Sequence, residues 1–201
     1  SSCFPRKGID VLLRAWGRAF IAEDDVTLII KTFPNPHNEA RVLLEMARDE
    51  NDGYPNVLLI EDDLTNEELK ALMMACDALV APSRGEGFGL PMLEAAACGL
   101  PVVATNWSGH LDFLNLGKWL PVDFSLSHIP PTRADGRIFI EGSSWAQPKE
   151  QDFKDKLNQV LKNKRDYTKS AADLAVEVRK HFCQSKINEY YDNFLKEIIN
   201  A

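Results

Sequence analysis

Short β-branched runs alternate with longer amphipathic segments along the first half of the chain, and this alternation constrains the fold more than any other feature. Apolar residues in the longer segments recur at helical spacing, whereas the short runs have the length of buried strands. Helices are expected at about 8–22, 38–48, 65–75 and 90–98, and strands at 26–30, 56–60, 78–81 and 101–104. Strands and helices that alternate through short links predict an α/β fold, with a parallel sheet covered by helices on both faces.

Local signals support several of these boundaries. Thr65, with Glu68 three residues later, predicts a capping box at the start of a helix. Pro91 suits the first turn of the next helix, and Gly99 suits its end.

The pattern changes beyond Gly117. Strands are expected at about 120–124 and 138–140, and Trp145 to Pro148 should form a turn with Trp145 packed in the core. Helices are then expected at 149–162, 167–181 and 186–199, with a further short one starting near Ser108. The last helix is amphipathic, and its apolar face either packs on the domain or contacts a neighbour. No linker or change in composition divides the chain, so one domain is expected over residues 1–201.

Composition excludes several classes of function. A net charge of −7 leaves no surplus of cations for nucleic-acid phosphates. The four cysteines are scattered, which favours reduced thiols, and the four histidines lack metal-ligand spacing and suit surface or capping positions. Neither a metal site nor a cofactor is therefore expected. No apolar stretch is long enough to cross a bilayer, and the first residues do not resemble a signal peptide.

The segment from Pro82 to Glu94, PSRGEGFGLPMLE, points to a ligand rich in oxygen atoms. It places Glu86 and Glu94 with seven residues between them, around glycines that lie between an expected strand and an expected helix. Glycines allow backbone N–H groups to approach a ligand closely, and a helix N-terminus favours anions. Ionised carboxylates accept hydrogen bonds from sugar hydroxyls. The combination is typical of a nucleotide-sugar site.

Two further features gain weight beside this segment. Glu94 alone would be an ordinary solvated helix residue, but its apolar neighbours suggest a largely buried helix, where an acid needs a partner. Arg6 and Lys7 precede the first helix, where cations oppose the helix dipole. They are either an exposed basic pair or the cations that hold a diphosphate. Because ligands of open α/β sheets bind at the carboxyl ends of the strands, the loops after Ile30, Ile60 and Ala81 should meet there.

At these residues the chain resembles the C-terminal, donor-binding half of retaining glycosyltransferases of the GT-B fold, in the family-4-like group. The likeness rests on Arg6-Lys7-Gly8, on Cys76 to Ala78, on Pro82 to Pro91 with Glu94 (the Glu-x7-Glu motif), and on Gly99 to Ala104. Trp145 to Pro148 also resembles the segment before the late helices of such proteins. The resemblance implies a Rossmann-like donor-binding domain, and a parent hexosyltransferase that uses a UDP- or GDP-sugar without a metal.

The resemblance also implies roles for individual residues. Lys7 would neutralise the donor diphosphate, with Arg6 or Lys31 in place of an arginine that the family usually has upstream. Glu86 would hold hydroxyls of the transferred sugar and support positive charge at its anomeric carbon. The segment Gly87-Phe88-Gly89-Leu90 would contact sugar and phosphate, and Glu94 would bind the ribose hydroxyls.

The resemblance further implies that an acceptor-binding N-terminal domain and a first strand are absent from this chain, so that the isolated domain would not turn over. It implies a cytoplasmic parent, peripheral at the inner face of a membrane where the acceptor is lipid-linked. Two alternatives stay open: a non-catalytic nucleotide-binding or regulatory module on the same fold, and a sugar phosphorylase or epimerase of the same architecture.

Overall fold

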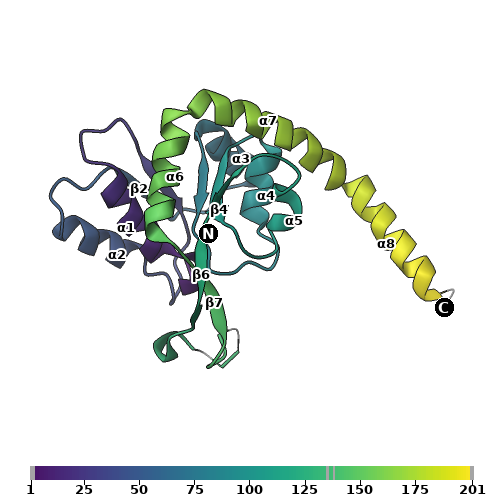
Figure 1. Cartoon of the computed structure of the whole chain (residues 1–201), viewed down its shortest axis with the longest axis horizontal. Coiled ribbons are helices and arrows are strands. Elements are labelled where there is room, and N and C mark those ends of the chain that lie inside the picture. The colour runs from purple at the N-terminus through teal and green to yellow at the C-terminus, as the bar shows by residue number, and fades with distance from the viewer. Residues whose placement is uncertain (1–2, 135, 138, 200–201) are drawn as a thin grey trace.

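The computed structural model describes residues 3–134, 136–137 and 139–199, and its parallel strands form two sheets (Figure 1). In the first, β1 (Leu28–Lys31) pairs with β2 (Val57–Ile60). In the second, β4 (Val102–Thr105) lies between β3 (Leu79–Ala81) and β5 (Leu120–Val122). The predicted α/β class and the parallel pairing are confirmed.

Helices surround both sheets, close to the predicted ranges. They are α1 (Ile9–Ala19), α2 (Ala40–Asp49), α3 (Asn66–Ala75), α4 (Leu90–Ala97), α5 (Leu111–Leu114), α6 (Glu150–Lys162), α7 (Lys164–His181) and α8 (Gln184–Ile199), with short 3-10 turns η1 (Pro5–Lys7) and η2 (Pro131–Arg133). The predicted capping box of Thr65 and Glu68 is present at the start of α3. No helix of the described residues has both the length and the apolar character needed to span a bilayer.

Strand β4 is buried on both faces, as the sequence predicts. Its side chains alternate between two cores, because successive residues of a strand point to opposite faces. Val103 packs in the core that contains residues of α1 and α6, whereas Val102 and Ala104 pack in the core formed with α4, α5 and α7. The three-stranded sheet is therefore the middle layer of the domain.

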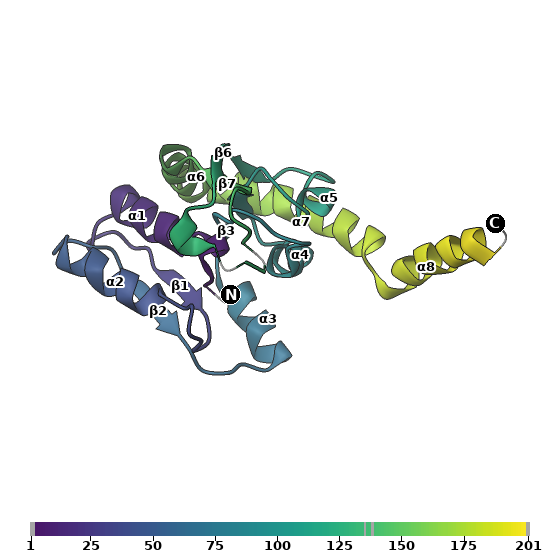
Figure 2. The same cartoon turned by 90° about the horizontal axis from the view of Figure 1, so that it is seen from below.

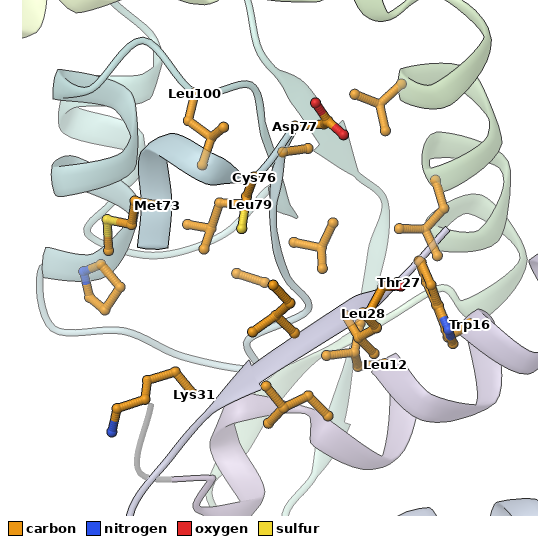
Figure 3. Close-up of a pocket in the computed structure, with 18 of the residues that line it drawn as sticks. Leu12, Trp16, Thr27, Leu28, Lys31, Met73, Cys76, Asp77, Leu79 and Leu100 are labelled. Atoms are coloured by element: carbon orange, nitrogen blue, oxygen red, sulfur yellow. The ribbon is translucent and has the colours of Figure 1, made fainter. Parts of the chain in front are cut away.

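The predicted single sheet is divided between β1 and β3. Instead of pairing with each other, these two strands border a cavity of about 520 Å³, which all their residues line. Apolar side chains of α1, including Leu12 and Trp16, lie on one side of it, and Met73 of α3 and Leu79 of β3 lie on the other (Figure 3).

The region after β5 differs from its prediction. Trp145 to Pro148 belongs to a strand, β7 (Ser144–Pro148), which pairs antiparallel with β6 (Phe124–His128) and is not a turn. Trp145 is half-buried against the guanidinium of Arg84 and is not a core residue. The pairing explains the error, because the hairpin projects from the domain and offers no core to this side chain (Figure 1). Of the strand expected at 138–140, residue 138 lies outside the described residues and 139–140 are not in a strand.

The last helix does not pack on the domain. Helix α8 continues away from the body beyond α7 (Figures 1 and 2). Apart from Ile187, which is half-buried, its apolar side chains are exposed, among them Tyr190, Tyr191, Phe194 and Ile198. Of the two interpretations of its amphipathic pattern, packing against the domain is therefore wrong.

A tight contact joins the N-terminal turn to the loop after β3. Gly8 ends η1 with a φ of 69°, and a Cβ atom at this position would lie 2.0 Å from the carbonyl oxygen of Pro82. The backbone N–H of Arg84 donates to the carbonyl of Arg6 at 2.7 Å. Residues that are far apart in the sequence are thereby held backbone to backbone, which requires glycine at position 8.

We expect Gly8→Ala to lower the free energy of unfolding by about 2 kcal/mol or more, since left-handed strain and a backbone clash act together. Urea denaturation measures the loss. Gly136→Ala is the matched control, because Gly136 has the same φ of 69° but no atom of the described residues within 4 Å of the added Cβ. Its loss should be about 1–2 kcal/mol, from strain alone. Equal losses in the two variants would show that the contact with Pro82 is not important.

Candidate functional site

The carboxylate of Glu86 lies at the centre of a cluster of charges. Lys7 Nζ donates to both of its oxygens, at 2.7 and 2.8 Å, and Arg6 Nη1 donates at 3.1 Å. Ser83 Oγ also donates to this carboxylate, and Arg6 reaches the carbonyl of Gly85 at 3.0 Å. Three residues that the sequence singled out, Arg6, Lys7 and Glu86, are thus in direct contact.

The cluster is sheltered from water and holds Glu86 ionised. The side chain of Glu86 is 5% exposed and that of Lys7 is 15% exposed. Burial alone would raise the pKa of Glu86. The hydrogen bonds from Lys7 and Ser83 and the charges of Lys7 and Arg6 outweigh burial and hold this pKa below its ordinary value of 4.5.

Arg84, which is not among the predicted site residues, connects the cluster to the neighbouring elements. It is buried, donates to both carboxylate oxygens of Asp10 at 2.8 and 2.7 Å, and donates to the carbonyl of Pro5 at 2.6 Å. Its Nε donates to Gln147 of β7 at 2.7 Å. Paired planar groups of this kind fix orientation as well as distance. Arg84 thus anchors η1, α1 and β7 to the loop that carries Glu86, and no local pattern in the sequence reveals this.

A second loop fixes the backbone of Glu86 from the other side. Ser108 Oγ accepts from the N–H of Glu86 at 2.9 Å and donates to its carbonyl at 2.6 Å. Ser108 has a φ of 99°, which is rare for a residue other than glycine and marks stored strain. The neighbouring Gly109 leaves room for Gly87, since a Cβ on Gly109 would lie 2.0 Å from the Gly87 carbonyl oxygen.

His110 corrects a prediction, because it is fully buried and is not a surface or capping side chain. The ring of Trp119 packs edge-on against it, Gly89 at the start of α4 lies close to its Cβ, and no side-chain capping bond is made. Its Nε2 lies 2.7 Å from the carbonyl of Thr105, and its Nδ1 has no hydrogen-bond partner within the described residues. Burial lowers the pKa of His110, which favours the neutral ring.

The cavity between β1 and β3 ends at this cluster. Its polar lining includes Lys7, Lys31, Ser83, Glu86 and Glu94, while the remainder is mostly apolar. Lys31 lies at the end of β1 (Figure 3), and its Nζ donates to the carbonyl of Thr32. Lys31, the residue after Ile30, and the loop after β3 line the cavity, but no residue of the loop that follows Lys31 does. The loop after β2 does not line the cavity, because β2 lies on the outer side of β1.

Glu94 is exposed, which corrects the expectation of a buried acid with a partner. Helix α4 buries Met92, Ala95 and Ala96 instead, and Glu94 lies on its other face at the cavity. Among the described residues no hydrogen bond or ion pair engages its carboxylate. Its oxygens are therefore available to hydroxyl groups.

The segment from Gly87 to Leu90 does not line the cavity. Phe88 packs against Phe113 and Phe182, with ring centroids 5.5 and 5.9 Å away. Gly89 starts α4 with a φ of 85°, and a Cβ there would lie 2.9 Å from the Cβ of His110. Leu90 is 58% exposed. The segment therefore positions the start of α4, beside the cluster.

The described residues contain no group of three or more His, Cys, Asp or Glu side chains that could hold a metal ion. All four cysteines are free thiols. A second cavity, of about 370 Å³, lies under the β6–β7 hairpin and is lined by residues such as Asp10, Arg133 and His128.

We expect Ser108→Ala to be less stable than Ser108→Gly by about 1 kcal/mol, as measured by urea denaturation. Both variants lose the two hydrogen bonds to Glu86, but only alanine keeps the strained positive φ. Ser125→Ala, at an exposed position of β6, serves as the control and should change stability little. Equal stability of the two Ser108 variants would argue against strain at this position.

The lowered pKa of Glu86 predicts a pH dependence of stability. A carboxyl group with a lowered folded-state pKa stabilises the fold fully above its unfolded pKa, and this contribution is lost as pH falls through the folded pKa. The difference in free energy of unfolding between the wild-type chain and Glu86→Gln should be constant above about pH 5.5. Below pH 4.5, the ordinary pKa, the wild-type chain should lose stability relative to Glu86→Gln.

Denaturation at a series of pH values measures this difference. In a Lys7→Met background the decline should be smaller, because Lys7 is the main partner that lowers the folded-state pKa, whereas the unfolded-state pKa sets where the decline begins. A difference that grew in favour of the wild-type chain on acidification would contradict the ion pairing.

Comparison with known proteins gives the site a family context. A family model described as glycosyl transferases group 1 matches residues 2–163. The MMP alpha-(1->4)-mannosyltransferase of Mycolicibacterium hassiacum is 34% identical over 107 residues, which are 53% of this chain and 24% of that protein. The D-inositol 3-phosphate glycosyltransferase of Salinispora tropica is 36% identical over 111 residues, which are 52% of this chain and 23% of that protein. The matched region is thus about a quarter of either relative's length.

Solved structures show the same fold at lower identity. Anabaena HepE in complex with UDP and glucose has a TM-score of 0.73 and 19% identity, over 98% of this chain and 47% of that chain. Sucrose-phosphate synthase from Thermosynechococcus elongatus also has a TM-score of 0.73 and 19% identity, over 100% of this chain and 44% of that chain. These neighbours are GT-B glycosyltransferases. Since the family model spans most of its length, the chain belongs to the glycosyl transferases group 1 family.

Proposed function

We propose that this chain is the donor-binding domain of a retaining, family-4-like hexosyltransferase that uses a UDP- or GDP-sugar. One observation carries the proposal: Lys7 and Glu86, which are 79 positions apart, converge at the polar end of one cavity. That end lies at the carboxyl ends of β1 and β3, where ligands of α/β sheets bind. The family membership supports a glycosyltransferase, and a neighbour with UDP and glucose supports a nucleotide-sugar donor.

Each residue has a role in this proposal. Lys7 and Arg6 hold the donor diphosphate, and Lys31 approaches from the end of β1. Negative charge grows on the leaving diphosphate during transfer, and these cations stabilise it in a site sheltered from water. Glu86 accepts hydrogen bonds from sugar hydroxyls and supports positive charge at the anomeric carbon. Glu94 accepts from the ribose hydroxyls. The backbone of Gly87, Phe88 and Gly89, which lies outside the cavity lining but beside the charged cluster, contacts sugar and phosphate.

We also propose that the acceptor-binding domain, and a first strand between β1 and β3, are supplied from outside these residues. Among the described residues no strand pairs with the facing edges of β1 and β3. These edges border an apolar cavity, which suits a further parallel strand and supports this part of the proposal. The relatives, about four times longer than the matched region, support the second domain. The isolated chain should then bind donor without turnover. A cytoplasmic parent, peripheral at a membrane, stays a prediction.

Calorimetric titration with UDP-, GDP- and ADP-sugars, beside the matching free nucleotides, tests the proposed function. We expect one sugar nucleotide to bind more tightly than its free nucleotide. A chain that binds sugar nucleotides no better than free nucleotides would support the alternative of a non-catalytic nucleotide-binding module.

Two variants test the assigned roles. Glu94→Ala should weaken the binding of every ribonucleoside diphosphate. Lys7→Ala should weaken the binding of diphosphates at least about tenfold, since a charge-assisted hydrogen bond is lost, while the affinity for the nucleoside changes little. Lys196→Ala on the projecting α8 is the charge-matched control and should have no effect. If Lys7→Ala bound diphosphates as tightly as the wild-type chain, the phosphates would have to bind at another site.

A further inference from the structure

The cations that the proposed function assigns to the diphosphate already have a partner. Lys7 contacts both carboxylate oxygens of Glu86, and Arg6 contacts one of them. Because Glu86 and most of Lys7 are shielded from solvent, their attraction is stronger than that of an exposed ion pair. A diphosphate that binds Lys7 and Arg6 must therefore compete with Glu86 for the same N–H donors.

The structure limits how Glu86 can respond to such a competitor. Its backbone is held by Ser108 at both the N–H and the carbonyl, at 2.9 and 2.6 Å. On the cation side, the bond from Arg84 to the carbonyl of Arg6 and the contact between Gly8 and Pro82 fix η1. With both backbones fixed, the carboxylate leaves the cations by rotation of its own side chain and not by opening of a loop.

We propose that Glu86 is a resident counter-ion of the diphosphate site, and that an incoming diphosphate displaces its carboxylate from Lys7 and Arg6. This inference rests on the proposed function and adds a basis for its specificity. The displaced carboxylate has lost three hydrogen bonds to cations, and hydroxyls of the donor sugar replace them. A diphosphate without a sugar offers no such replacement.

The exchange therefore makes the site selective against the free diphosphate. Every ligand meets the cost of displacing the carboxylate, but only a sugar-bearing ligand offers hydroxyls to the displaced group. The same competition favours release of the nucleoside diphosphate that remains after sugar transfer.

Calorimetric titration of the whole chain with inorganic diphosphate tests the exchange, because this probe has neither ribose nor sugar. Glu86→Gln should bind inorganic diphosphate roughly fivefold or more tightly than the wild-type chain, the lower end of typical coupling between sites. Its preference for a sugar nucleotide over the free nucleotide should fall in parallel. Ser83→Ala, which removes one hydrogen bond to the carboxylate without a change in charge, should raise the affinity for inorganic diphosphate by a smaller factor.

Asp25→Asn is the matched control, because Asp25 lines the same cavity and has no role in the proposed site. The substitution removes one negative charge from a carboxylate that does not contact Lys7 or Arg6. It should leave binding of inorganic diphosphate unchanged. An equal gain in both variants would overturn the exchange in favour of a general effect of net charge.

The remaining outcomes separate the two proposals. If sugar nucleotides bind but inorganic diphosphate binds equally well to the wild-type chain and to Glu86→Gln, the proposed function stands and the exchange is wrong. If no variant binds a diphosphate of any kind, the proposed function fails and the exchange fails with it.

Discussion

The contact between the turn that ends at Gly8 and the loop that follows β3 determines the rest of the site. Two backbones meet there with no space for a side chain, and the buried Arg84 fixes them through Asp10 and Pro5. Lys7 and Glu86 gain their positions from this contact, since each lies one or two residues from an anchored atom. The site thus depends on the contact between η1, which precedes α1, and the loop that follows β3.

Charge balance is the second constraint. Cations and a carboxylate that are sheltered from water need partners, because an unpaired buried charge is costly. In the described structure, Arg6, Lys7, Ser83 and Glu86 satisfy one another. Glu94 needs no such partner, because it is exposed. The two glutamates of the motif thus differ in environment. The carboxylate of Glu86 must leave its cations before it can bind a ligand, whereas that of Glu94 is already available to ligand hydroxyls.

The sequence predicts the part of the fold that depends on local periodicity and turn chemistry. The capping box at Thr65, the strand–loop–helix context of Glu86 and the alternation of strands and helices are local features, and the structure confirms them. The errors arise where distant contacts decide. Trp145 belongs to a strand because β6 pairs with its segment, and His110 is buried because its loop packs on the start of α4. The roles of Arg84 and Ser108 likewise depend on partners remote in sequence.

A crystal structure of the chain with the sugar nucleotide that it binds most tightly tests the central claim most directly. We expect the diphosphate within hydrogen-bond distance of Lys7 and Arg6, and the Glu86 carboxylate turned from these cations toward the sugar. The backbone of Glu86 should keep its two hydrogen bonds with Ser108 Oγ. A ligand bound elsewhere, such as the cavity under the β6–β7 hairpin, would contradict the assigned site. A diphosphate bound with the Lys7–Glu86 pair intact would contradict the exchange.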